Sequence, residues 1–322
     1  MLSDVRNYYG LARDFGQAGY FETEHSEQII RELKLEIKAG KLVALSGIIG
    51  SGKSTMLRRI QEALSQDKEI LASKSLSVEK GQISLATLIM ALFYDLATEK
   101  DFKIPTQPER RERALRDLIR KRQKPIALFI DDAHDLHSKT LIGLKRLIEV
   151  VRDSGGTLSV VLAGHPKLKN DLRRPSMEEI GSRATIFELE GLGTEKRKYI
   201  KWLLVQSMVP KTKMEGIITE DAFAMLSEKL STPLQFEFYL TRALEEAYKV
   251  GQKLGADMID NVLAKDINGL EPRLTREGYN VKVLAELLNA KPREIKEFLR
   301  GQLAPGRTQE LQNELLAAGI PL

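Results

Sequence analysis

Residues 47–55 read "GIIGSGKST" and follow directly on the apolar run "KLVALS" (41–46). They match the pattern G-x-x-x-x-G-K-[ST], in which glycines let successive backbone N–H groups turn inward around phosphate oxygens. The amphipathic segment "STMLRRIQEALSQ" (54–66) comes next, and its N-terminus adds a favourable dipole for an anion. The sequence therefore predicts a phosphate-binding loop between a buried strand and a helix, rather than a glycine-rich turn with a solvated lysine.

This loop predicts ATP and Mg²⁺ as ligands. In the pattern, Lys53 reaches the β- and γ-phosphates, and the Ser54 hydroxyl ligates Mg²⁺. The chain is accordingly expected to be an ATPase. The predicted nucleotide-binding residues of the loop are Gly47, Gly50, Ser51, Gly52, Lys53, Ser54 and Thr55.

Two further strands end in polar side chains. In "IALFIDDAH" (126–134), Asp131 suits a Mg²⁺ ligand and Asp132 an acid that orients or deprotonates the attacking water, although the two acids could instead cap the next helix. In "VVLAGHP" (160–166), His165 ends the next strand. The carboxyl ends of parallel strands line the ligand crevice, so His165 is predicted to touch the γ-phosphate or the water. A turn histidine before Pro166 is the alternative.

The order of elements predicts an α/β fold with a second, helical part. Apolar strand runs alternate with helices up to about residue 190, which favours a five-stranded parallel sheet covered on both faces. One of these helices is predicted over 26–40 with Ser26 as its N-cap, and another over the apolar stretch 83–97. The predicted domains are a nucleotide-binding α/β core (1–190), a helical lid (191–270) and a small helical C-terminal module (271–322).

Composition narrows the class of protein. The chain has 322 residues, of which 42% are hydrophobic and 30% charged, as in soluble multidomain proteins. It contains no cysteine, which excludes a disulfide scaffold, a thiolate zinc site and thiol catalysis. The N-terminus shows no secretory signal, and the apolar stretch 83–97 is too short to span a bilayer. A cytoplasmic bacterial protein without a membrane segment is predicted.

The motifs resemble those of the AAA+ superfamily of phosphate-loop ATPases over about residues 8–265. More narrowly, the chain resembles the family that joins secretion-type ExeA ATPases with transposition helpers of the MuB, IstB, TniB and TnsC kind. The resemblance rests on "YYGLARDFGQAGYF" (8–21), the two nucleotide motifs and "VVLAGHPKL" (160–168). It implies a homo-oligomer, either a hexameric ring or a helical filament.

The resemblance also implies roles for single residues. Tyr20, Phe21 and His25 are expected to wall the adenine. Arg183 is expected to be an arginine finger that reaches the γ-phosphate of a neighbouring subunit, with Arg173 and Arg174 as competitors.

Two positions depart from the family pattern. The family has Asp-Glu where this chain has Asp131-Asp132, and the shorter acid suits slow, switch-like hydrolysis. Its lids often carry an arginine where "STPLQFEF" (231–238) has Leu234, which puts a lid arginine contact to the γ-phosphate in doubt.

Basic residues suggest double-stranded DNA as a partner, bound without sequence preference. Residues 103–124 are rich in Lys and Arg, which is typical either of a solvated helix face or of a track along the phosphate backbone. In the transposition helpers, loops in this part of the core line a DNA path. The candidate DNA contacts are Lys74, Lys80, Lys103, Arg110, Arg111 and Arg113. The C-terminal segments 281–288 and 292–302 resemble a helix-turn-helix, which could bind DNA or a protein.

The leading hypothesis is an ATP-dependent, oligomeric DNA-binding ATPase that acts as a transposition helper. In this role it would select the target and activate a DDE transposase. A cytoplasmic ATPase of a secretion or envelope-assembly machine is the first alternative. An origin-loading or remodelling AAA+ ATPase is the second.

Overall fold

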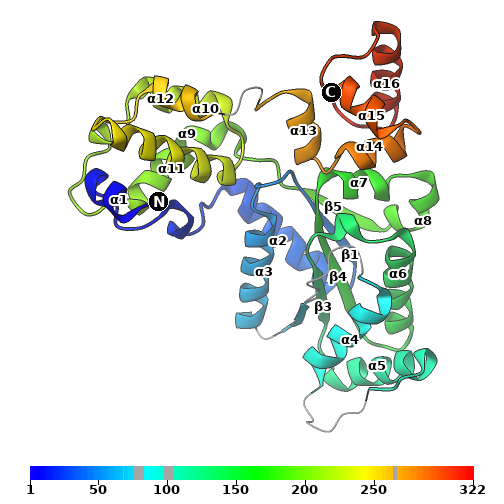
Figure 1. The fold of residues 1–322 in the computed structure, drawn as a ribbon. Helices are drawn as coiled ribbons and strands as arrows, with labels where there is room; N and C mark the ends of the chain where they lie inside the picture. Colours follow the sequence, from blue (N-terminus) through cyan, green and yellow to red (C-terminus); the bar gives the residue numbers. More distant parts are fainter. Residues whose placement is uncertain (68, 75–82, 98–103, 264–266) are drawn as a thin grey trace. The chain divides into compact units, whose positions relative to one another are not determined.

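The structure, a computed structural model, describes residues 1–322 except 68, 75–82, 98–103 and 264–266 (Figure 1). It consists of two compact units. An α/β unit comprises residues 23–47 and 53–189, and a helical unit comprises residues 1–22, 48–52 and 190–322.

The α/β unit is built on one parallel sheet. Its five described strands lie in the order β2-β3-β4-β1-β5. Strands β1, β3 and β4 are buried along their whole length, as expected of continuous apolar runs covered on both faces. The strands are β1 (Leu42–Ser46), β2 (Leu71–Lys74), β3 (Ile126–Ile130), β4 (Leu158–Gly164) and β5 (Ala184–Glu188). The predicted α/β class and five-stranded sheet are confirmed.

Helices cover the sheet on both sides (Figure 1). Two of them, α2 (Glu24–Lys38) and α3 (Lys53–Asp67), pack on one face through a cluster that includes Leu33 and Ile60. The opposite face carries a larger cluster that includes Phe93 and Leu144. The helices of that face are α4 (Leu85–Leu96), α5 (Pro108–Arg122), α6 (Ser138–Asp153), α7 (Pro166–Leu172) and α8 (Glu178–Gly181).

The strand order determines where the predicted motifs meet. Strand β4 lies between β1 and β3, with Gly164 opposite Ser46 and Leu162 opposite Ile130. All three strands run the same way, so the loop after β1, the acids after β3 and the histidine after β4 emerge at one edge.

Two helices refine the sequence predictions. Thr23, not Ser26, is the N-cap of α2, and Ser26 completes a capping box as the third helical residue. The Ser26 Oγ faces the Thr23 backbone N–H at 3.0 Å, so the box satisfies two donors at the helix start. The apolar helix α4 is capped by Ser84 and buries Leu92 and Phe93. Within the described ranges, no helix is long and apolar enough to cross a membrane.

The helical unit contains two separate hydrophobic clusters. The first joins Tyr9 and Phe15 near the N-terminus to Leu203, Phe236 and other side chains after residue 190. Its helices are α1 (Ser3–Tyr9), α9 (Lys196–Ser207), α10 (Glu220–Lys229), α11 (Pro233–Lys249) and α12 (Ala256–Val262). The second cluster holds α13 (Leu270–Arg276), α14 (Val281–Leu287), α15 (Pro292–Leu299) and α16 (Pro305–Ala317).

The predicted domain boundaries at residues 190 and 270 stay a prediction. Residues 1–22, which the sequence placed with the core, belong to the helical unit, because their apolar side chains are buried among its helices. Helix α15 begins at Pro292, the first-turn position that proline favours.

Candidate functional site

The loop after β1 has the backbone that phosphate binding requires. Strand β1 ends at Ser46, and the Gly47 N–H donates to the Gly164 carbonyl at the end of β4 (3.1 Å). Gly50 and Gly52 have φ angles of +81° and +95°, which side chains with a Cβ rarely adopt. A Cβ on Gly52 would meet no atom within 4 Å, so the space beside this glycine is open.

Lys53 begins α3 and is held inside the site. Only 7% of its surface is exposed, and its Nζ donates a hydrogen bond to the Gly47 carbonyl (2.8 Å). Burial lowers the pKa of Lys53, while the charges of Asp131 and Asp132 act in the opposite direction. The ammonium group is thus held by the loop close to two carboxylates, where a phosphate would complete its coordination.

The hydroxyl residues of the loop differ in their surroundings. The Ser51 Oγ is buried and has no hydrogen-bond partner among the described residues. Ser54 is exposed, and Thr55 is half-buried with its Oγ1 accepting from Arg58 at 3.4 Å. An orphaned buried hydroxyl and a buried lysine both suit an anionic ligand at this loop.

Asp131 and Asp132 form the turn after β3. The Asp131 Oδ1 accepts the backbone N–H of Asp132 (2.9 Å), which fixes the first carboxylate at the strand end. Asp132 has a φ of +51°, a left-handed conformation that aspartate tolerates better than most residues. Asp131 is exposed and Asp132 is half-buried, so both carboxylates remain accessible from the sheet edge.

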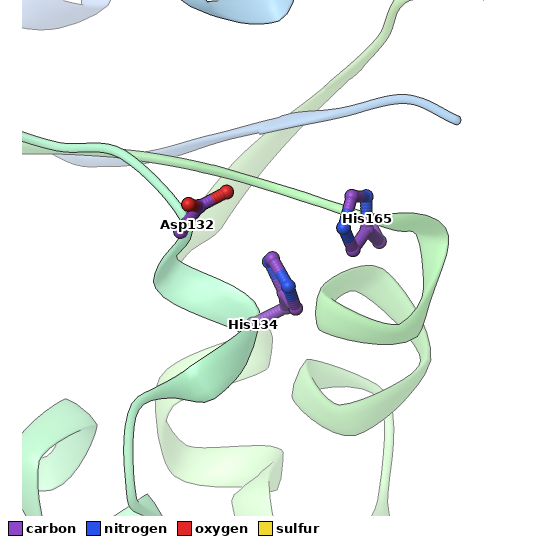
Figure 2. Close-up of side chains that lie close together, drawn as sticks. All are labelled: Asp132, His134 and His165. Carbon is purple, nitrogen blue, oxygen red and sulfur yellow. The ribbon is translucent and has the colours of Figure 1, made fainter. Parts of the chain in front are cut away.

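His165 and His134 lie close together at this edge, with their rings tilted relative to each other (Figure 2). Their ring centroids are 3.8 Å apart with an interplanar angle of 46°. Burial lowers the pKa of His134, and burial together with the neighbouring His134 and Lys53 lowers the pKa of His165 to about 4. Both imidazoles are therefore neutral at neutral pH. Sequence analysis did not select His134, although the turn Ala133–Asp135 brings it to the predicted site.

The predicted adenine-binding residues divide between the two units. The Phe21 ring packs against Tyr199 and Trp202, with 5.4 Å between ring centroids in each pair, and the adjoining Tyr20 is half-buried. His25 lies on α2, where its Nε2 is 3.3 Å from the Glu188 carbonyl. The structure assigns Tyr20 and Phe21 to the helical unit and His25 to the α/β unit, so their joint role stays a prediction.

The candidate finger arginines are all on the surface of the α/β unit. Arg183 lies between α8 and β5 and is 56% exposed in its side chain, with an ion pair to Glu149 of the same chain. Arg174 pairs with Asp171 at 3.0 Å, and Arg173 is exposed. All three remain candidates for contact with another subunit.

The candidate DNA contacts have different environments. Lys74 is the last residue of β2, whereas Lys80 and Lys103 lie outside the described residues. The Arg111 guanidinium donates to the carbonyls of Pro105 (2.9 Å) and Thr106 (2.8 Å), and so holds the segment before α5. Arg110 and Arg113 are exposed on α5.

The exposed cations of α5 share one face. At about 100° per residue, Arg110, Arg113, Arg120 and Lys121 fall within an arc of about 100°. Asp117 lies inside this arc and pairs with Arg120 at 3.6 Å. We call these four cations the α5 stripe; its charge is mostly uncompensated within the helix.

Comparisons with known proteins agree with this geometry. Residues 36–172 match the family model described as an AAA domain. The match includes the phosphate loop, Asp131 and Asp132, and the paired histidines His134 and His165. It confirms the prediction that the chain carries a nucleotide-binding P-loop ATPase domain.

Relatives resemble parts or all of the chain at low identity. General secretion pathway protein A of Aeromonas hydrophila is 28% identical over 153 residues, which are 45% of this chain but only 26% of that protein. Cdc6p from Pyrobaculum aerophilum has a similar structure, with a TM-score of 0.56, 16% identity and coverage of 98% of this chain and 90% of Cdc6p. The structure of the Aeropyrum pernix Orc1 protein in complex with DNA is also similar, with a TM-score of 0.51 and 14% identity. The similarity covers 92% of this chain and 84% of the Orc1 chain. At these identities, the structural likeness shows the fold.

Proposed function

We propose that this chain is an ATP-dependent, oligomeric DNA-binding ATPase that helps a DDE transposase in the bacterial cytoplasm. The grouping of Lys53, Asp131, Asp132 and His165 at one sheet edge carries the proposal, because it supplies a phosphate cation, a metal ligand and a water-directed acid together. The narrower role as a transposition helper rests on the resemblance of the motifs.

The residues fit a nucleotide with Mg²⁺. The open space at Gly52, the buried Lys53 ammonium and the orphaned Ser51 hydroxyl all suit phosphate oxygens. Ser54 and Asp131 would hold Mg²⁺, which neutralises phosphate charge when bound. Asp132 then orients the attacking water, and the neutral His165 ring next to it can donate or accept a hydrogen bond.

Hydrolysis in this site acts as a slow switch. Asp132 has one methylene fewer than the glutamate of the resembled family, so its carboxylate reaches a shorter distance from the strand end. Slow turnover gives an ATP-bound assembly a lifetime that a partner can read or shorten.

Arg183 is the proposed link between subunits. Its exposed guanidinium pairs with Glu149 in the same chain, and a surface pair of this kind is worth less than about 1 kcal/mol. Exchange of Glu149 for a neighbour's γ-phosphate therefore costs little. The phosphate is the more highly charged partner and is held in a drier site.

Arg183→Ala is expected to lower turnover by about 10³-fold in assembled protein, as removal of an arginine finger does. ATP affinity of the separated subunit should not change, because its own loop is intact. Turnover measured over a range of protein concentrations checks this, with Arg152→Ala as the control for loss of a surface arginine. If Arg183→Ala hydrolyses ATP as fast as the parent at saturating protein concentration, Arg183 is not the arginine finger, and Arg173 or Arg174 becomes the candidate.

The α5 stripe is the proposed contact to DNA. Arginine and lysine bind backbone phosphates without reading bases, so binding should be insensitive to sequence. A single stripe offers few contacts, and subunits aligned by ATP would make these contacts multivalent.

Arg110→Glu/Arg113→Glu is expected to abolish DNA binding at moderate salt and leave ATP affinity unchanged. Where binding is still measurable at low salt, the slope of log K against log salt should fall by about two per subunit. Fluorescence anisotropy with labelled duplex DNA measures the DNA affinity and its dependence on salt. Lys201→Glu/Lys253→Glu changes the net charge equally at exposed positions of the helical unit. Equal loss in both variants would refute a specific role of α5.

A secretion or envelope-assembly role is the second candidate, and the 28% identity to General secretion pathway protein A favours it. That likeness covers about a quarter of the relative's length. The two candidates differ in DNA binding, which the secretion role does not require.

A further inference from the structure

Asp132, His134 and His165 bring three potential metal-ligand atoms together at the carboxyl edge of the sheet (Figure 2). One donor atom from each side chain lies within 4.8 Å of the other two. The residues come from the turns that follow β3 and β4, two hydrogen-bonded neighbouring strands. The sheet therefore fixes the distance between the two turns.

Polar groups lie beside both imidazoles, while one nitrogen of each ring lacks a hydrogen-bond partner among the described residues. The Nε2 of His134 lies 3.7 Å from an Asp135 carboxylate oxygen, while its Nδ1 is buried without a partner among the described residues. The Nδ1 of His165 is also buried and unpartnered, and the Gly47 backbone acts on the same ring through a hydrogen bond. In the tautomers with a proton on Nε2, the two unpartnered Nδ1 atoms would offer their lone pairs to an ion.

We propose that Asp132, His134 and His165 bind a divalent transition-metal ion, with Zn²⁺ as the ion that fits best. Two imidazoles and one carboxylate, with a fourth position open to water, form a ligand set that zinc accepts. The Asp135 carboxylate and the Gly47 carbonyl then serve as the outer hydrogen-bond acceptors that metal-bound imidazoles require. Mg²⁺ fits this set poorly, because it prefers oxygen ligands throughout.

Closing the site on an ion requires only small movements. Ligand atoms of a tetrahedral zinc with bonds of about 2.0–2.1 Å lie about 3.4 Å apart. The present separations are at most 4.8 Å, and rotations about the side-chain bonds of the three residues can close the difference.

Local charges set the affinity. The carboxylates of Asp132 and Asp135 favour a cation, whereas the Lys53 ammonium opposes it. A phosphate on Lys53 would remove part of that opposition.

Metal binding would occupy the carboxylate that the proposed hydrolysis uses. With Asp132 bound to an ion, it no longer orients water, so turnover stops while the phosphate loop stays intact. This consequence rests on the proposed function; metal binding itself does not.

The experiment titrates Zn²⁺ and Co²⁺ into nucleotide-free protein that carries no histidine tag. The chain has four histidines and no cysteine, so His25 and His137, both exposed, provide a matched control. Calorimetry and Co²⁺ absorption should show one ion per parental chain. His134→Ala/His165→Ala should bind at least about 100-fold more weakly, while His25→Ala/His137→Ala should bind as the parent. Asp135→Asn should weaken binding by about tenfold through the outer acceptor.

Equal metal affinity in both double variants, or no stoichiometric binding by the parent, would overturn the site. If the first double variant does not fold by circular dichroism, His134→Gln replaces it with the same expectation. A second arm adds Zn²⁺ during ATP hydrolysis with Mg²⁺. Zinc that binds at the site without slowing turnover would leave the metal site standing and refute the assigned role of Asp132.

Discussion

Lys53→Ala is expected to weaken ATP binding by about 10- to 100-fold and to abolish measurable turnover. The variant removes a cation that is 93% buried and hydrogen-bonded to the loop at Gly47. A charge-assisted hydrogen bond to phosphate is worth about 1.5–3 kcal/mol, and each 1.4 kcal/mol changes affinity tenfold. Turnover should fall further, because Lys53 is proposed to offset the charge that develops on the γ-phosphate.

Titration with a fluorescent ATP analogue measures the loss of affinity. Lys139→Ala removes an exposed lysine at the start of α6 and should bind ATP as the parent does. Equal affinity of Lys53→Ala and the parent would contradict the assignment of the phosphate loop.

Asp132→Asn is expected to lower turnover by about 10²- to 10⁴-fold with ATP affinity nearly unchanged, as loss of a general base does. Asparagine has the same shape and tolerates the left-handed backbone at this position, so the turn should keep its geometry. Asp131, the proposed Mg²⁺ ligand, is unchanged in this variant, so ATP with Mg²⁺ should remain bound.

Steady-state hydrolysis and nucleotide titration on the same preparation separate the two effects. Asp153→Asn neutralises an exposed acid at the end of α6 and serves as the control. Turnover of Asp132→Asn at the parental rate would show that another group directs the water.

The parts of the site that the sequence predicts are those fixed by local pattern. Glycine spacing specifies the loop, and apolar runs that end in acids or histidine specify strand ends at one sheet edge. The sequence did not predict that His134 belongs to the site, because the position of His134 depends on the backbone conformation at Asp132. The φ of +51° at Asp132 directs the chain into the turn Ala133–Asp135. A signal existed, since two of the four histidines follow closely on buried strands.

Other differences arise from tertiary packing. Thr23 and Ser26 are both good cap residues, and their reciprocal hydrogen bonds make Thr23 the cap. Residues 1–22 belong to the helical unit because Tyr9 and Phe15 pack among its apolar side chains. This packing joins residues far apart in the chain, so no local sequence pattern predicts it. Arg111 reads as part of a basic track, yet its guanidinium holds the backbone before α5.

The dependence of DNA binding on the bound nucleotide tests the central claim most directly. Anisotropy of a labelled duplex would be followed at low and moderate salt with ATP, ADP and a slowly hydrolysed ATP analogue. Tight binding with ATP and the analogue, weak binding with ADP and a steep loss with salt are expected, because in the proposed function only the γ-phosphate aligns subunits along the duplex. Equal binding with all three nucleotides would contradict the account, and no binding under any condition would favour the secretion role.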